Sequence, residues 1–207
     1  MAEVFIFVFG TIIGSFLNVV IFRYHTGESI VKTGSRCFSC GKKLKWYELI
    51  PVASFAIQRG RCRGCGSKIS WQYPIVELLT GIIFFAITWK SNFQVEIGFP
   101  SLPVYYFIIF SLLIIIAVYD LRHQIIPNLF VYIFAFLAFL NLFGNWKLEI
   151  RNFDTNSFLV GLIFFAFFGS LWLISHGRWM GLGDAKLALG IGWFLGFYKG
   201  ILALLVS

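Results

Sequence analysis

Apolar residues fill six long stretches of the chain, which are separated by short polar connections and by one long polar segment. None of the stretches alternates strictly between apolar and polar positions, so lipid-facing β-strands are disfavoured. Several stretches approach the roughly 20 residues that a helix needs to cross a bilayer. The pattern predicts an all-α, polytopic bundle of transmembrane helices. The expected spans lie near residues 3–22, 74–89, 103–119, 126–143, 157–175 and 184–198.

The composition strengthens this prediction. Of 207 residues, 59% are hydrophobic and 13% are charged, and the mean hydropathy is +0.84. A soluble domain needs far less apolar material to fill one core, so we expect a membrane protein. The last apolar stretch, from Gly200 to Ser207, is too short to cross alone unless it continues the span before it, which suggests a chain that is cut short.

The positive charge of the chain, +8 in total, indicates a topology. The first apolar stretch does not look like a cleaved signal peptide, because Glu3 stands where a basic region is usual and Arg23 follows directly. The long polar segment between Arg23 and Tyr73 holds ten basic residues and two acidic ones. By the positive-inside rule this segment is cytoplasmic. Threading the spans alternately then brings Arg122, Arg178 and Lys186 to the same side.

The basic residues flank predicted spans and no recognition helix is apparent, so we expect attraction to anionic membrane lipids and no nucleic-acid partner. The predicted organisation has three parts: a first transmembrane helix over residues 1–22, a cytoplasmic loop over 23–73, and a transmembrane helical core over 74–207.

All four cysteines lie in the cytoplasmic loop, as two C-x-x-C-G turns: Cys37 with Cys40, and Cys62 with Cys65. Two such turns supply the four soft ligands of a tetrahedral zinc site. A pair of disulfides is the competing interpretation, but thiols stay reduced in the cytoplasm. Four cysteines close the coordination sphere, so we expect a structural zinc ion that stabilises a zinc-ribbon-like loop.

Two acidic residues stand at predicted membrane boundaries on the cytoplasmic side. Asp120 ends the third span and Asp184, within GLGDAKL, opens the sixth. A carboxylate in this position usually faces the interior of the bundle and has a function. Each could instead be paired, Asp120 with Arg122 or His123, and Asp184 with Lys186 or with the N-terminus of its helix.

For the two aspartates together we favour a catalytic pair. Repulsion between two carboxyl groups in one site keeps one protonated and one ionised, which is the arrangement needed to activate water and polarise a carbonyl. Gly181 and Gly183 would let another backbone approach the site, and Lys186 is a further site-shaping candidate. Elsewhere, Glu77 is expected to stabilise the start of a helix, and Asn18 to form a hydrogen bond between helices.

These residues together resemble the type IV prepilin leader peptidases, which are bacterial polytopic membrane aspartic proteases of the GxGD type. The resemblance covers most of the chain in the right order. It rests on the following stretches: GSFLNVVIFR at 14–23, the two C-x-x-C turns, WYELIPVASF at 46–55, RGRCRGCGSKIS at 59–70, YPIVELLTG at 73–81, DLRHQIIPN at 120–128 and GLGDAKLALG at 181–190.

The resemblance implies that Asp120 and Asp184 are catalytic and that the four cysteines hold zinc. It implies prepilin or pseudopilin substrates of type IV pilus and secretion systems, cut between glycine and phenylalanine at the cytoplasmic face of the bacterial inner membrane. Many members then methylate the new amino terminus with S-adenosylmethionine, and the cysteine loop belongs to that bifunctional form. Residues that bind S-adenosylmethionine cannot be assigned from the sequence, although the loop and Glu77 are places to look. Family members usually continue beyond Ser207.

Two other functions remain open at this point. Tyr119 and Asp120 together with GLGD also resemble presenilin-like intramembrane proteases, which lack the cysteine loop. The second open function is non-enzymatic: a zinc-bearing membrane scaffold or transporter in which the aspartates relay protons or cations.

Overall fold

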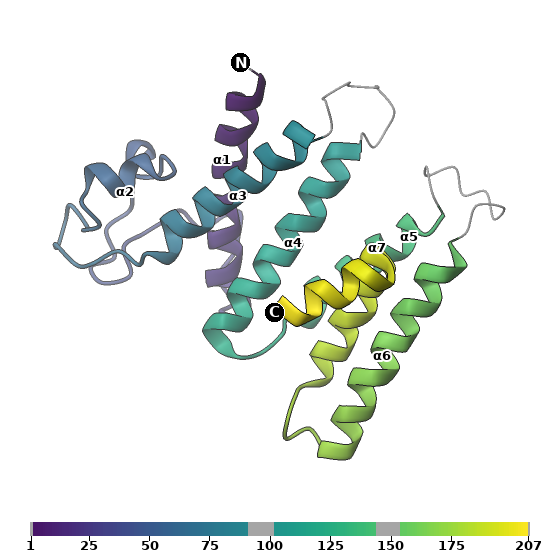
Figure 1. Cartoon of the computed structure of the whole chain (residues 1–207). Helices are drawn as coiled ribbons and strands as arrows, with labels where there is room; N and C mark the ends of the chain where they lie inside the picture. The colour runs from purple at the N-terminus through teal and green to yellow at the C-terminus, as the bar shows by residue number, and fades with distance from the viewer. Residues whose placement is uncertain (1, 91–101, 144–153, 207) are drawn as a thin grey trace. The chain divides into compact units, whose positions relative to one another are not determined.

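The computed structural model describes residues 2–90, 102–143 and 154–206, and in these residues the chain is helical without a β-strand. Within these described residues, five helices are long and apolar enough to cross a membrane. The elements are α1 (Ala2–Arg23), the 3₁₀ turn η1 (Trp46–Glu48), α2 (Ala53–Ile57), α3 (Gln72–Lys90), α4 (Leu102–His123), α5 (Asn128–Asn141), α6 (Thr155–Ser175) and α7 (Leu182–Val206) (Figure 1). The all-α class is confirmed for the described part of the chain.

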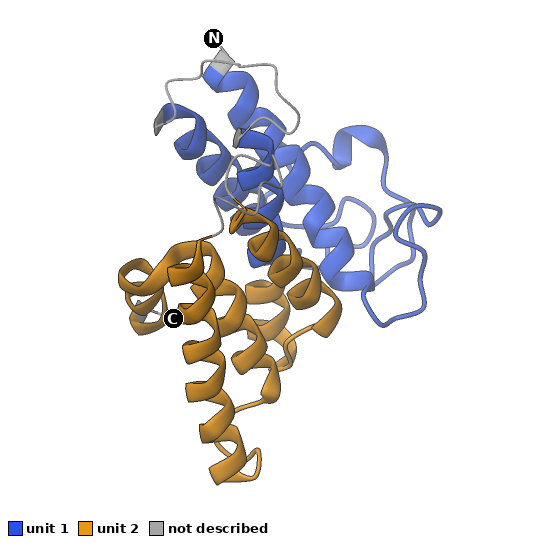
Figure 2. Ribbon diagram, turned by 90° about the vertical axis from the view of Figure 1, so that its right-hand side faces the viewer, with its two compact units in different colours: residues 1–115 blue, residues 116–207 orange. Residues whose placement is uncertain are grey.

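The chain divides into two compact units, residues 1–115 and 116–207, with the division inside α4 (Figure 2). The first unit holds the cysteine loop between α1 and α3. The second holds the end of α4 together with α5, α6 and α7, and therefore both Asp120 and Asp184.

In the first unit, α1 packs closely on α3 through small residues. A Cβ atom added at Gly10 would stand 2.8 Å from the Cα of Gly81, and one added at Gly14 would stand 2.7 Å from the Cα of Glu77. Such contacts are typical of helices that associate within a membrane, because glycine lets the backbones approach. Asn18 is fully buried and its Nδ2 donates to the Tyr73 carbonyl at 3.3 Å, which confirms the predicted hydrogen bond between helices.

In the second unit, α7 packs on both α5 and α6. The contact with α6 is a glycine crossing, in which a Cβ added at Gly192 would stand 2.6 Å from the Cα of Gly161. Beside it, Trp193 Nε1 donates to the Phe158 carbonyl at 3.2 Å. On the α5 side, Gly190 leaves room for the ring of Phe134.

Two of the predicted spans differ in the structure. The expected span 126–143 is the 14-residue helix α5, about 21 Å long at 1.5 Å per residue. Upright, it is shorter than the roughly 30 Å hydrocarbon core. The last span extends to Val206, because the final apolar stretch continues α7 beyond a kink at Gly196, whose φ is +68°.

Candidate active site and metal centre

The two C-x-x-C-G turns fold into two nearly identical knuckles. In the first, the Cys37 N–H donates to the Lys42 carbonyl and the Gly41 N–H donates to the Cys37 carbonyl, both at 2.9 Å. In the second, the Cys62 and Gly66 N–H groups make the same two bonds at the same distances, to the carbonyls of Ser67 and Cys62. Both glycines have φ of +71°, a left-handed conformation that side chains disfavour. The sequence repeat is thus a structural repeat.

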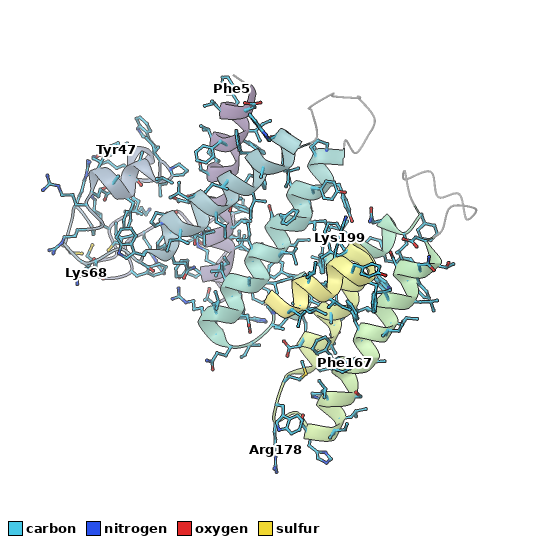
Figure 3. All side chains as sticks on the ribbon, viewed as in Figure 1. Phe5, Tyr47, Lys68, Phe167, Arg178 and Lys199 are labelled. Atoms are coloured by element: carbon cyan, nitrogen blue, oxygen red, sulfur yellow. The ribbon has the colours of Figure 1, made fainter. Side chains whose placement is uncertain are left out.

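The knuckles bring the four sulfur atoms together. All four lie within 4.8 Å of one another, and Cys37 Sγ is 3.9 Å from Cys65 Sγ. Ligands at about 2.3 Å around a tetrahedral ion would stand about 3.8 Å apart. Figure 3 shows yellow sulfur atoms grouped close to the labelled Lys68. The donor set and its spacing fit a closed four-thiolate metal site.

Local polar contacts favour the thiolate form of Cys37 and hold the loop together. Backbone N–H groups of Cys40 and Ser39 lower the pKa of the Cys37 thiol to about 6. The side chain of Glu48 is buried, and its carboxylate accepts the Lys45 N–H at 2.9 Å and pairs with Lys42 Nζ at 3.1 Å. These two donors hold the pKa of Glu48 below its usual range.

Asp120 lies in the last turn of α4 and Asp184 in the first turn of α7, as the sequence predicts. Both side chains are half-buried. Gln124, with φ of +53°, ends α4, and a four-residue turn leads to α5. Ile126 in this turn packs against Gly183, the neighbour of Asp184. The start of α7 therefore lies against the connection that follows Asp120.

Asp184 is oriented by the start of its own helix. The Gly181 N–H donates to Asp184 Oδ2 at 3.0 Å, and the Asp184 N–H donates to the Gly181 carbonyl at 3.2 Å. This is the helix N-terminus contact that the sequence offered as one alternative for Asp184. The Gly181 N–H contacts Oδ2 of Asp184 and not Oδ1.

Lys186, the other partner considered for Asp184, is turned to α5. Its Nζ donates to Asn128 Oδ1 at 3.1 Å and to the Tyr132 hydroxyl at 2.8 Å, and it lies 4.9 Å from the centre of the Tyr132 ring. Lys186 therefore links α7 to the beginning of α5. No sequence pattern indicated this link, because Asn128 and Tyr132 lie far from Lys186 in the chain.

The two glycines of GLGD have different surroundings. A Cβ added at Gly183 would stand 2.9 Å from the Ile126 Cβ, so this position needs glycine, although a side chain and not a backbone is what approaches it. Around Gly181 the nearest described atom to an added Cβ is Asp184 Oδ2 at 3.7 Å, an ordinary contact. Gly181 is therefore not crowded.

Glu77 plays a part that its sequence position did not reveal. It is buried in α3, and its Oε2 accepts the N–H of Val52 from the cysteine loop at 2.7 Å. Val52 has φ of +60°, which is rare for a β-branched residue. An acidic residue inside an apolar span was the available signal, but nothing local indicated its partner.

Comparison with known proteins agrees with the two-part arrangement. The bacterial peptidase A24 N-terminal domain matches residues 8–91, and the type IV leader peptidase family matches residues 107–207. Among curated proteins, a Vibrio cholerae prepilin leader peptidase/N-methyltransferase is 35% identical over 193 residues, which cover 89% of this chain and 74% of the relative. The chain belongs to the type IV leader peptidase family.

Other curated relatives are also named prepilin leader peptidase/N-methyltransferase. The Bacillus subtilis protein is 35% identical over 196 residues, covering 92% of this chain and 73% of the relative. The Myxococcus xanthus protein is 43% identical over 124 residues, covering 60% of this chain and 35% of the relative. No solved structure gives a significant match. The family expected from the sequence is confirmed, and the five long apolar helices agree with a leader peptidase that is a membrane protein.

Proposed function

We propose that this protein is a membrane aspartic endopeptidase that removes the basic leader from prepilins or pseudopilins, with Asp120 and Asp184 as the catalytic pair. The observation that supports the proposal is that both residues lie in the second unit, where Ile126 of the connection after Asp120 packs on Gly183, the neighbour of Asp184. The relatives' names, which state prepilin leader peptidase activity, supply the substrate class.

The chemistry follows from two carboxyl groups that share a site. Their repulsion favours a state in which one is ionised and one is protonated. The ionised group takes a proton from water as the water oxygen attacks the peptide carbonyl carbon, and the protonated group donates to the carbonyl oxygen. The protons then return to the leaving amine and the catalytic pair, so no covalent intermediate with the protein is formed.

The cleavage is proposed to fall between glycine and phenylalanine at the cytoplasmic face of the inner membrane. The basic loop supports this orientation through the positive-inside rule, and Asp184 at the start of α7 is then near the cytoplasmic boundary. At this depth the substrate's basic leader would remain in water while its hydrophobic helix lies in the bilayer.

A second step, N-methylation of the new amino terminus, is proposed from the relatives' names. S-adenosylmethionine would supply the methyl group, which moves from its sulfonium sulfur to the amine. No residue is assigned to this step. The four cysteines would hold one structural zinc ion that keeps the loop folded, because a closed four-thiolate sphere leaves no position for water.

The test is mass spectrometry of a prepilin incubated with the purified protein, with and without S-adenosylmethionine. We expect the mature pilin beginning at phenylalanine in both reactions, and a mass increase of one methyl group only with the cofactor. An unchanged prepilin in both reactions would contradict the peptidase assignment. Cleavage without methylation would contradict only the second step. Elemental analysis is expected to find one zinc per chain.

A further inference from the structure

The cysteine loop contains one apolar run bounded by basic residues. Between Lys45 and Arg59 the sequence reads WYELIPVASFAIQ, in which Glu48 is the single charged residue. The carboxylate of Glu48 is paired with Lys42 and the Lys45 N–H, as described above. We call residues 45–59 the apolar loop segment. Its composition is unlike that of a loop that lies entirely in water.

Several large side chains of the apolar loop segment are exposed. Trp46 is 78% exposed and Ile57 is 68% exposed, with Leu49 and Ile50 at 40% and 42%. Exposed apolar groups gathered in one short segment usually mark an interaction surface.

The position of the segment relative to the spans indicates what it contacts. Ile50, Pro51 and Val52 line a half-open apolar cavity of about 430 Å³, whose other lining residues belong to α1 and α3. The α1 side of the cavity includes Thr11 and Ile12, which stand near the midpoint of this 22-residue helix. The segment is thus beside the spans and not beyond their ends, as Figure 1 shows for α2 and α1.

Several backbone N–H groups of the segment have hydrogen-bond partners within the protein. At the start of α2, the Ser54 N–H donates to the Ile50 carbonyl and the Ala53 N–H donates to the Pro51 carbonyl. Pro51 has no N–H group, and the N–H of Val52 is satisfied by the buried Glu77 of α3. Non-helical backbone at membrane depth requires this kind of internal partner.

We propose that the apolar loop segment is embedded in the lipid bilayer beside α1 and α3, with its apolar side chains in the acyl-chain region. The basic residues Lys45 and Arg59 at its two ends fit anionic lipid headgroups. The half-open cavity lined by Ile50–Val52 takes a lipid acyl chain. The loop is therefore membrane-anchored independently of the proposed cleavage and methylation reactions.

The test is photocross-linking in the full-length protein, reconstituted in vesicles of phosphatidylethanolamine and phosphatidylglycerol. Benzoylphenylalanine is placed at Ile50, at Ile57 and, as the matched control, at Val31. Val31 is aliphatic, belongs to the same loop and is 89% exposed, but lies outside the segment. After irradiation, mass spectrometry is expected to find phospholipid adducts at positions 50 and 57 and none at 31.

Absence of lipid adducts at both 50 and 57, or equal labelling at 31, would overturn the proposal. Cross-links to added prepilin in place of the lipid adducts would also overturn the proposal, because the segment would then be a substrate-docking surface.

A second measurement does not depend on the photoreactive side chain. The fluorescence of Trp46 is the difference between the wild type and Trp46→Phe. Brominated lipids are expected to quench this fluorescence more than iodide in water does, and the reverse order would contradict lipid embedding.

Discussion

Single residues explain why the start of α7 has the sequence GLGD. Gly181 and Gly183 look equivalent in the sequence, yet only Gly183 is crowded in the structure. The difference comes from Ile126, which reaches α7 from a distant part of the chain. A sequence pattern can indicate a helix start with a carboxylate in its first turn, but it cannot show which glycine a tertiary contact requires.

Gly183→Ala is expected to displace Ile126 and the turn after Asp120, because the added Cβ would be 2.9 Å from the Ile126 Cβ. A shift of this size near reacting groups lowers prepilin cleavage about 10- to 100-fold. Gly181→Ala is the control, since its Cβ would make only ordinary contacts. Cleavage rates measured under single-turnover conditions check this, and equal rates for the two variants would contradict it.

At the scale of elements, α7 is held by two different kinds of contact. Toward α6 it uses glycines and Trp193, and toward α5 it uses Gly190 and the Lys186 hydrogen bonds. Hydrophobic patterns predicted the helices because a span is defined by its own residues. They could not predict these pairings, since nearly every face of such a helix is apolar.

Gly161→Ala is expected to destabilise the α6–α7 contact by about 1–3 kcal/mol, because the new Cβ would stand 2.3 Å from Trp193 Cδ1. Gly169→Ala on the same helix is the control. No described atom lies within 4 Å of a Cβ added at Gly169, so alanine there leaves stability unchanged or raises it by up to about 1 kcal/mol. Unfolding in mixed micelles measures both, and a Gly161→Ala variant as stable as Gly169→Ala would refute the close crossing.

Lys186→Met is expected to remove the link from α7 to Asn128 and Tyr132. In a double-mutant cycle with Asn128→Ala, the coupling should be about 0.5–1 kcal/mol, at the low end because the groups are exposed. Unfolding of the two single variants and the double variant in mixed micelles provides the measurement. Additive effects would show that this link does not stabilise the pair of helices.

At the scale of the whole molecule, the cysteines and the acid pair belong to different units. The sequence allowed both candidate sites to be proposed, because a C-x-x-C repeat and an acidic residue within an apolar stretch are local signals. The bond from Val52 to Glu77 was not predictable, since it depends on how the loop returns to α3. That bond ties the loop to the membrane spans of the first unit.

Removal of metal by a chelator is expected to unfold the cysteine loop, because a small loop of this kind depends on its metal for folding free energy. Since Asp120 and Asp184 are in the other unit, methylation should fall more than cleavage. The same order is expected for Cys62→Ser. Parallel assays of both reactions, with zinc restored as a control, check the order, and a complete loss of cleavage with methylation retained would reverse the proposed division of labour.

The most direct test of the catalytic pair compares three aspartate-to-asparagine variants. Asp120→Asn and Asp184→Asn remove one ionisable carboxyl group each and keep the shape of the side chain. Asp154→Asn is the matched control, because Asp154 is exposed and accepts the Ser157 N–H at the start of α6, a role that asparagine fills equally well. In a prepilin cleavage assay read by mass spectrometry, we expect no mature pilin from the first two folded variants and normal processing by the third. Normal processing by either Asp120→Asn or Asp184→Asn would contradict the account.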